Sequence, residues 1–104
     1  MVKIKLDKER TLKLGMRGII ALQEKTGIDA FKGIDIANMS SKEKTALIWA
    51  CLLHDDHDLD FDYLADLLDL SNIASTIQKV AECIMESVPS REGNDPLVET
   101  PQDG

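Results

Sequence analysis

The chain has 104 residues, and 19 acidic against 12 basic residues give it a formal net charge of −7. A net-acidic domain is poorly suited to general binding of phosphate backbones, and a chain this short buries only ~60–65% of its unfolded surface, which leaves little core to support a strained, buried active site. Its longest apolar run, residues 46–53, is much shorter than the ~20 residues that cross a bilayer, so we expect no membrane helix.

The N-terminal residues predict a β-hairpin. Apolar residues alternate with charged ones from Val2 to Leu6, and Leu12 and Leu14 again fall on one face of a strand. The polar residues 7–10 are expected to form the turn between the two strands.

A first helix is predicted over residues 16–25, where hydrophobic residues recur at helical spacing. Thr26 and Gly27 would end it, because glycine readily takes the left-handed conformation of a helix cap. Residues 28–39 have no clean period, and we expect a short helical turn and a loop there.

The clearest helix signal begins at Ser40. Glu43 follows it at capping-box spacing, so each residue can satisfy an amide of the other. The predicted helix extends to His54, and its second half, residues 46–53, is apolar on every side. Such a helix must be surrounded, so we expect it at the centre of the fold.

Two more helices are predicted after this central helix. Asp60 can cap one over residues 61–69, and Ser71 can cap an amphipathic one over residues 72–88. The fold class is therefore α+β and mainly helical, with an N-terminal two-stranded hairpin followed by a compact bundle of about four helices. We expect a single domain over residues 1–88 and a disordered acidic tail over residues 89–104, which hold all three prolines.

The stretch of residues 54–58, His-Asp-Asp-His-Asp, invites a metal-site interpretation, since imidazole and carboxylate groups bind Zn, Mn or Fe. Consecutive residues cannot all point at one ion, however, and the chain has only these 2 histidines. Asp58, Asp60 and Asp62 repeat the spacing of a calcium-binding EF-hand loop, but Tyr63 stands where that loop needs glycine. An acidic turn leading into a helix N-terminus explains these residues better.

Nucleophilic catalysis has little support in the sequence. Cys51 and Cys83 lie in apolar helical stretches without a Cys-x-x-Cys pair, so buried, reduced thiols are expected. Glycine pairs such as that at residues 15–18 do not extend to a lysine-serine phosphate motif. We therefore predict no enzymatic activity, no catalytic or metal site and no cofactor.

Four stretches of the chain, in order and at characteristic spacing, carry a family resemblance: residues 12–15 (LKLG), 19–27 (IIALQEKTG), 47–54 (LIWACLLH) and 63–69 (YLADLLD). Over about residues 2–88, the chain resembles the small tail assembly chaperones of long-tailed bacteriophages and prophages. It departs from the family at Met16, where an aromatic residue is common.

This resemblance implies a non-enzymatic protein acting in the cytoplasm of the host bacterium and absent from the mature virion. Such chaperones bind the tape measure protein, keep that long hydrophobic helical protein soluble and help to recruit tail tube subunits. The partners implied are thus the tape measure protein, the tail tube protein and other copies of the chaperone.

The charges of the chain are segregated in a way that suits self-association. Residues 1–17 carry +4 and residues 54–69 carry −7. Complementary patches allow head-to-tail contacts between copies. We hypothesise that a basic surface of one copy contacts an acidic surface of the next copy. The basic surface comprises Lys3, Lys5, Lys13 and Arg17. The acidic surface comprises Asp55, Asp56, Asp58, Asp60 and Asp62.

An apolar surface for the tape measure protein is expected in residues 28–39, which hold more hydrophobic residues than their irregular pattern readily buries. The candidates are Phe31, Ile34, Ile36 and Met39. The alternative function is a small acidic DNA mimic that inhibits a nuclease or regulator. It would need carboxylates spread at roughly phosphate spacing, and residues 54–69 would cover only a short piece of such a surface.

Overall fold

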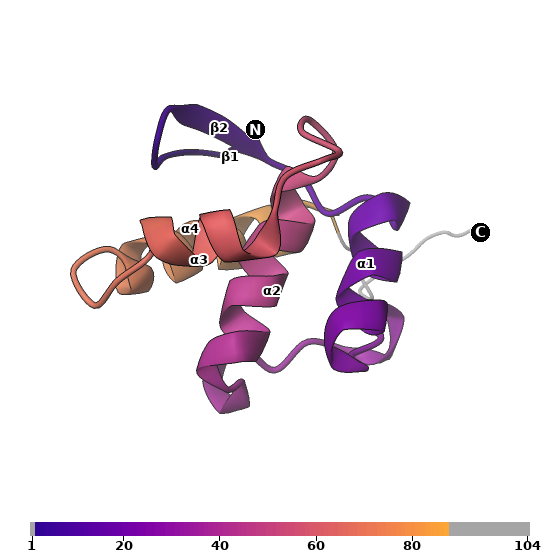
Figure 1. The fold of residues 1–104 in the computed structure, drawn as a ribbon. Coiled ribbons are helices and arrows are strands. Elements are labelled where there is room, and N and C mark those ends of the chain that lie inside the picture. Colours follow the sequence, from indigo (N-terminus) through magenta and orange to yellow (C-terminus); the bar gives the residue numbers. More distant parts are fainter. Residues whose placement is uncertain (1, 88–104) are drawn as a thin grey trace.

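The computed structural model describes residues 2–87, and Figure 1 shows their arrangement. In chain order the elements are β1 (Val2–Lys5), β2 (Glu9–Leu12), α1 (Met16–Thr26), the short 3-10 helices η1 (Ala30–Lys32) and η2 (Ile36–Asn38), α2 (Ser41–Leu52), α3 (Phe61–Leu67) and α4 (Ile73–Ser87). α1 packs along one side of α2, while α3 and α4 pack on its other side. The predicted α+β class, with an N-terminal hairpin and four helices, is confirmed.

The hairpin buries one of its faces. Val2 pairs with Leu12 and Ile4 pairs with Arg10 in an antiparallel register. These four side chains are buried, because β1 packs on α4 and β2 packs on α2. The alternation of apolar and charged residues therefore sets which face of the hairpin contacts the helices.

The hairpin turn is shorter than predicted. Residues 7–10 were expected to form it, but β2 already begins at Glu9 and the turn comprises residues 6–8. Arg10 is thus part of the strand and lies on its buried face. An arginine is tolerated there because acidic partners reach its guanidinium, as described below.

α1 ends where the sequence predicts. Gly27 follows it with φ 83°, in the left-handed region, and its amide donates to the carbonyl oxygen of Gln23 at 2.7 Å. The helix packs on α2 through Gly18 and Leu22, which are both buried. The segment that follows forms the two 3-10 helices η1 and η2 in place of a single helical turn.

α2 is the centre of the molecule, as predicted. Its capping box is formed: Ser40 Oγ accepts from the amide of Glu43 at 3.2 Å, and Glu43 Oε1 accepts from the amide of Ser40 at 2.8 Å. The buried residues face every direction and are Ala46, Leu47, Ile48, Ala50, Cys51 and Leu52. The helix ends at Leu52, just before the predicted His54.

α3 is capped by Asp60, whose Oδ2 accepts from the amide of Tyr63 at 2.9 Å. The helix ends at Leu67, so Asp69 lies in the turn that leads to α4. The prediction that Ser71 caps α4 is wrong. Its hydroxyl and amide both donate to Oδ1 of Asp69, which also accepts from the amide of Asn72 and so organises the turn.

α4 carries the predicted amphipathic stripe. Val80 is fully buried, and Ile73, Ile77 and Ile84 pack against the core as partly buried side chains. Val88 and the predicted tail, residues 89–104, lie outside the described residues. Within residues 2–87, no helix combines the length and the apolar character needed to span a membrane.

Candidate functional site

The outer face of the hairpin, with the residue that follows β2, carries three of the predicted basic residues. Lys3 and Lys5 are exposed there and Lys13 is exposed directly after β2, and we refer to these three residues as the lysine face. Lys3 lies opposite Thr11, and Lys5 lies opposite Glu9. Arg17 is exposed too and belongs to the first turn of α1, outside the hairpin.

The predicted acidic residues follow α2 in the acidic loop, residues 54–60, and continue into α3. Asp55, Asp58 and Asp62 are exposed and, among the described residues, have no hydrogen bond or ion pair through their carboxylates. Asp56 is half-buried and pairs with Arg10, whereas Asp60 caps α3. Only part of the predicted acidic surface therefore has carboxylates available to a second molecule.

The acidic loop lies against the hairpin of the same chain. Arg10, which is only 6% exposed, binds Oδ1 of Asp7 through Nε and Oδ2 of Asp7 through Nη2, each at 2.9 Å. Its Nη1 reaches Oδ2 of Asp56 at 3.3 Å. The hydroxyl of Tyr63 donates to Oδ2 of Asp7 at 2.8 Å. This ion cluster fastens the hairpin turn to the acidic loop and to α3.

The ion cluster shifts the titration of its members. The hydrogen-bonded Arg10 guanidinium lowers the pKa of Asp7 well below its usual range. The same carboxylate raises the pKa of the Tyr63 phenol, because it accepts the phenolic proton in a hydrogen bond. These shifts favour a charged Asp7 carboxylate and a neutral Tyr63 phenol, the forms that make the hydrogen bonds between the hairpin turn and α3.

The two histidines lie in different surroundings. His54 Nε2 lies 2.7 Å from the carbonyl oxygen of Thr11 in β2, so this ring nitrogen donates to the backbone. His57 lies on the other side of the loop, at the end of a groove between α1 and α2. Across residues 2–87, no three His, Cys, Asp or Glu side chains are grouped so that they could hold a metal ion.

The predicted apolar surface of residues 28–39 is only partly exposed. Phe31 is 67% exposed, whereas Met39 is buried at 9% exposure. Ile34 and Ile36 pack against the core as partly buried side chains. The two 3-10 helices fold this segment back onto the core, so Phe31 alone of the four candidates presents most of its side chain to solvent.

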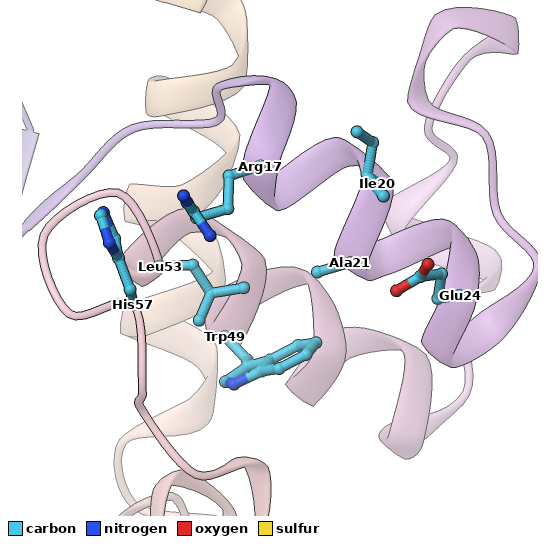
Figure 2. Close-up of a pocket in the computed structure, with 7 residues that line it drawn as sticks. All are labelled: Arg17, Ile20, Ala21, Glu24, Trp49, Leu53 and His57. Atoms are coloured by element: carbon cyan, nitrogen blue, oxygen red, sulfur yellow. The ribbon is translucent and has the colours of Figure 1, made fainter.

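A groove between α1 and α2 was missed by the sequence analysis (Figure 2). It has a volume of about 570 Å³ and is lined by Arg17, Ile20, Ala21 and Glu24 of α1, Trp49 and Leu53 of α2, and His57 of the acidic loop. Ile20, one of the residues at helical spacing in the helix predicted over residues 16–25, is 49% exposed. The buried residues of α1 are Gly18 and Leu22, and Gly18 lies against the backbone of Ala50 in α2.

Trp49 is held in a fixed orientation at the floor of this groove. Its Nε1 donates to the carbonyl oxygen of Leu59 at 2.8 Å, and its ring meets that of Phe61 edge to face at 5.8 Å. The Lys25 ammonium lies 4.4 Å from the centroid of Phe61 and 5.8 Å from that of Trp49. These contacts fix the orientation of the Trp49 ring in the folded chain.

The two cysteines are buried and free of disulfides, as predicted. A hydrogen bond with Cys83, together with burial, raises the pKa of the Cys51 thiol well above its usual value. The thiolate that nucleophilic chemistry needs is therefore disfavoured at this position.

Comparison of the chain with protein-family models, with curated proteins and with solved structures finds no match.

Proposed function

We propose that the chain is a non-enzymatic phage tail assembly chaperone. In this role it binds the tape measure protein, keeps it soluble in the host cytoplasm and helps to recruit tail tube subunits, and it is left out of the mature virion. The family resemblance of about residues 2–88 is the starting point of this proposal.

The observation that carries the proposal is the apolar surface of α1 and α2. Ile20 is half-exposed, and it lines an open groove together with Trp49 and Leu53. Exposed apolar surface framed by polar groups is typical of sites that bind other proteins. A chaperone for a hydrophobic helical protein needs such a surface, whereas an enzyme would need convergent reactive groups.

The DNA-mimic alternative finds less support. A mimic must present its carboxylates outward along an extended face, but Asp56 is paired with Arg10 and Asp60 caps α3. Within residues 54–69, the exposed carboxylates without a partner are those of Asp55, Asp58, Asp62 and Asp66, which belong to one loop and one short helix and would cover only a short piece of DNA-like surface.

Co-expression tests the proposed function. The tape measure protein of the same phage or prophage would be produced alone, with this chain, and with an unrelated acidic protein of similar size. We expect this chain alone to keep the tape measure protein in the supernatant after centrifugation and to co-purify with it. A tape measure protein that stays insoluble, or is solubilised equally by the unrelated protein, would contradict the proposal.

A further inference from the structure

We infer that the groove between α1 and α2 binds one face of an amphipathic helix from a partner protein, with an acidic residue of that helix at Arg17 and His57 and a basic residue at Glu24. The chemistry of this docking site is read from the groove itself. The identity of the natural partner, a helix of the tape measure protein, rests on the proposed function.

The floor of the groove favours an apolar occupant. Ile20 is 49% exposed in the unbound chain, and the Trp49 ring, which also lines the groove, is fixed by its bond to Leu59 and its contact with Phe61. A partner that covers Ile20 and Trp49 removes apolar surface from water and does not have to order the tryptophan first.

The two ends of the groove differ in charge. Figure 2 shows Arg17 and His57 at one end and Glu24 at the other. Within residues 2–87, none of these three side chains makes an ion pair or a side-chain hydrogen bond. Arg17 and a His57 ring N–H can both donate to a carboxylate, and the Glu24 carboxylate can accept from a lysine or arginine.

The spacing of these charges matches a helix. Arg17 and Glu24 are seven residues apart on α1, which is two turns or about 10 Å along the axis. A partner helix lying along α1 would place an acidic and a basic residue seven positions apart and two apolar residues between them, at the third and fourth positions after the first charge. One face of a two-turn helix thus meets both charged ends and the apolar floor.

Synthetic helical peptides of about 15 residues test this inference. One peptide carries leucines at the two central positions of one face, glutamate at one end of that face and lysine at the other. A second peptide is identical except that lysine replaces the glutamate. Trp49 is the only tryptophan of the chain, so its fluorescence reports occupancy when the peptides contain none.

We expect the full-length wild-type chain to bind the glutamate–lysine peptide about tenfold more tightly than the lysine–lysine peptide. Arg17→Glu should invert this preference, because both ends of the groove are then acidic. Lys79→Glu makes the same change of charge at an exposed position of α4, and it should keep the wild-type preference. Circular dichroism checks that both variants are folded.

Three results would overturn the inference: no saturable change in fluorescence with either peptide, an Arg17→Glu variant with the wild-type preference, or a change in fluorescence that follows protein concentration without peptide. The last result would mean that a second copy of the chain occupies the groove.

Co-expression of Arg17→Glu with the tape measure protein separates the two proposals. If wild type and Arg17→Glu solubilise that protein equally and the peptides show no preference, the groove inference fails while the proposed function stands. If the peptide preference inverts as expected but wild type leaves the tape measure protein insoluble, the proposed function fails and the groove remains a helix-binding site.

Discussion

Gly18 of α1 and Ala50 of α2 meet backbone to backbone: a Cβ atom added at Gly18 would overlap the carbonyl oxygen of Ala50 and lie 3.3 Å from Cδ1 of Leu14. Glycine inside a helix costs ~1 kcal/mol relative to alanine. Here its missing side chain allows the two helices to approach closely, and the same pair of helices forms the groove that contains Trp49.

Replacing this glycine should therefore destabilise the protein. We expect Gly18→Ala to lower the free energy of unfolding by about 2 kcal/mol, because α1 must shift away from the Ala50 backbone. Urea denaturation followed by circular dichroism measures the change. Gln23→Ala, at an exposed position of the same helix, should stay within about 0.5 kcal/mol of wild type. A Gly18→Ala variant as stable as wild type, or more stable, would show that α1 can accommodate a Cβ atom next to the Ala50 backbone without loss of stability.

The ion cluster gives a second prediction. Arg10→Ala should lower the free energy of unfolding by about 2–3 kcal/mol, since Asp7 and Asp56 would lose their shared cation. The cost is below that of a fully buried pair because both carboxylates keep some contact with water. Lys3→Ala, on the exposed face of the same hairpin, is the matched control and should change the stability by less than about 0.5 kcal/mol. Equal stability of the two variants would contradict this role of Arg10.

Acid should weaken the fold partly through Asp7. The pKa of Asp7 is lowered in the folded state by its hydrogen bonds to Arg10, so folding favours the charged form. Its contribution is present above the unfolded pKa of ~3.9 and is lost as the pH falls below that value. Urea denaturation between about pH 6 and pH 2.5 should show a shallower loss of stability for Asp7→Asn than for wild type. Arg10→Ala should also flatten the profile, and an Asp7→Asn profile parallel to wild type would contradict the assignment.

Self-association should depend on salt if the lysine face meets the acidic loop of a neighbouring copy. We expect assemblies seen by sedimentation velocity at ~50 mM NaCl to dissociate near 1 M NaCl, where the screening length falls to ~3 Å. Lys13→Glu should weaken assembly at low salt, and adding Asp58→Lys should restore part of it. An assembly state that ignores both ionic strength and the Lys13→Glu change would exclude the electrostatic model.

The elements of the fold could be predicted because their signals are local. Ser40 and Glu43 cap each other's amides across a single helix turn, and their three-residue spacing is visible in the sequence. Gly27 ends α1 in the left-handed conformation, which the glycine itself indicates. The run at residues 46–53 could likewise be placed at the centre of the fold, because a helix that is apolar on every side must be covered on every side.

The surfaces could be predicted less well, because a side chain's exposure depends on what packs over it. Met39 was expected to be available to a partner and is buried, while Ile20, which was not among the candidates for an apolar surface, is half-exposed. Similarly, Asp56 was expected on a free acidic surface, but it pairs with Arg10, which lies 46 residues earlier in the chain.

For this protein, the sequence by itself determined the type and order of the elements, the caps of α2 and α3, and the central position of α2. These depend on interactions between residues a few positions apart and on the overall hydrophobic pattern. Only the tertiary structure decided how closely α1 approaches α2, which charges are neutralised within the chain, and where the groove with Arg17, Trp49 and Glu24 opens. Those features join residues from separate elements, and their relative placement follows from packing of the whole core rather than from any local spacing.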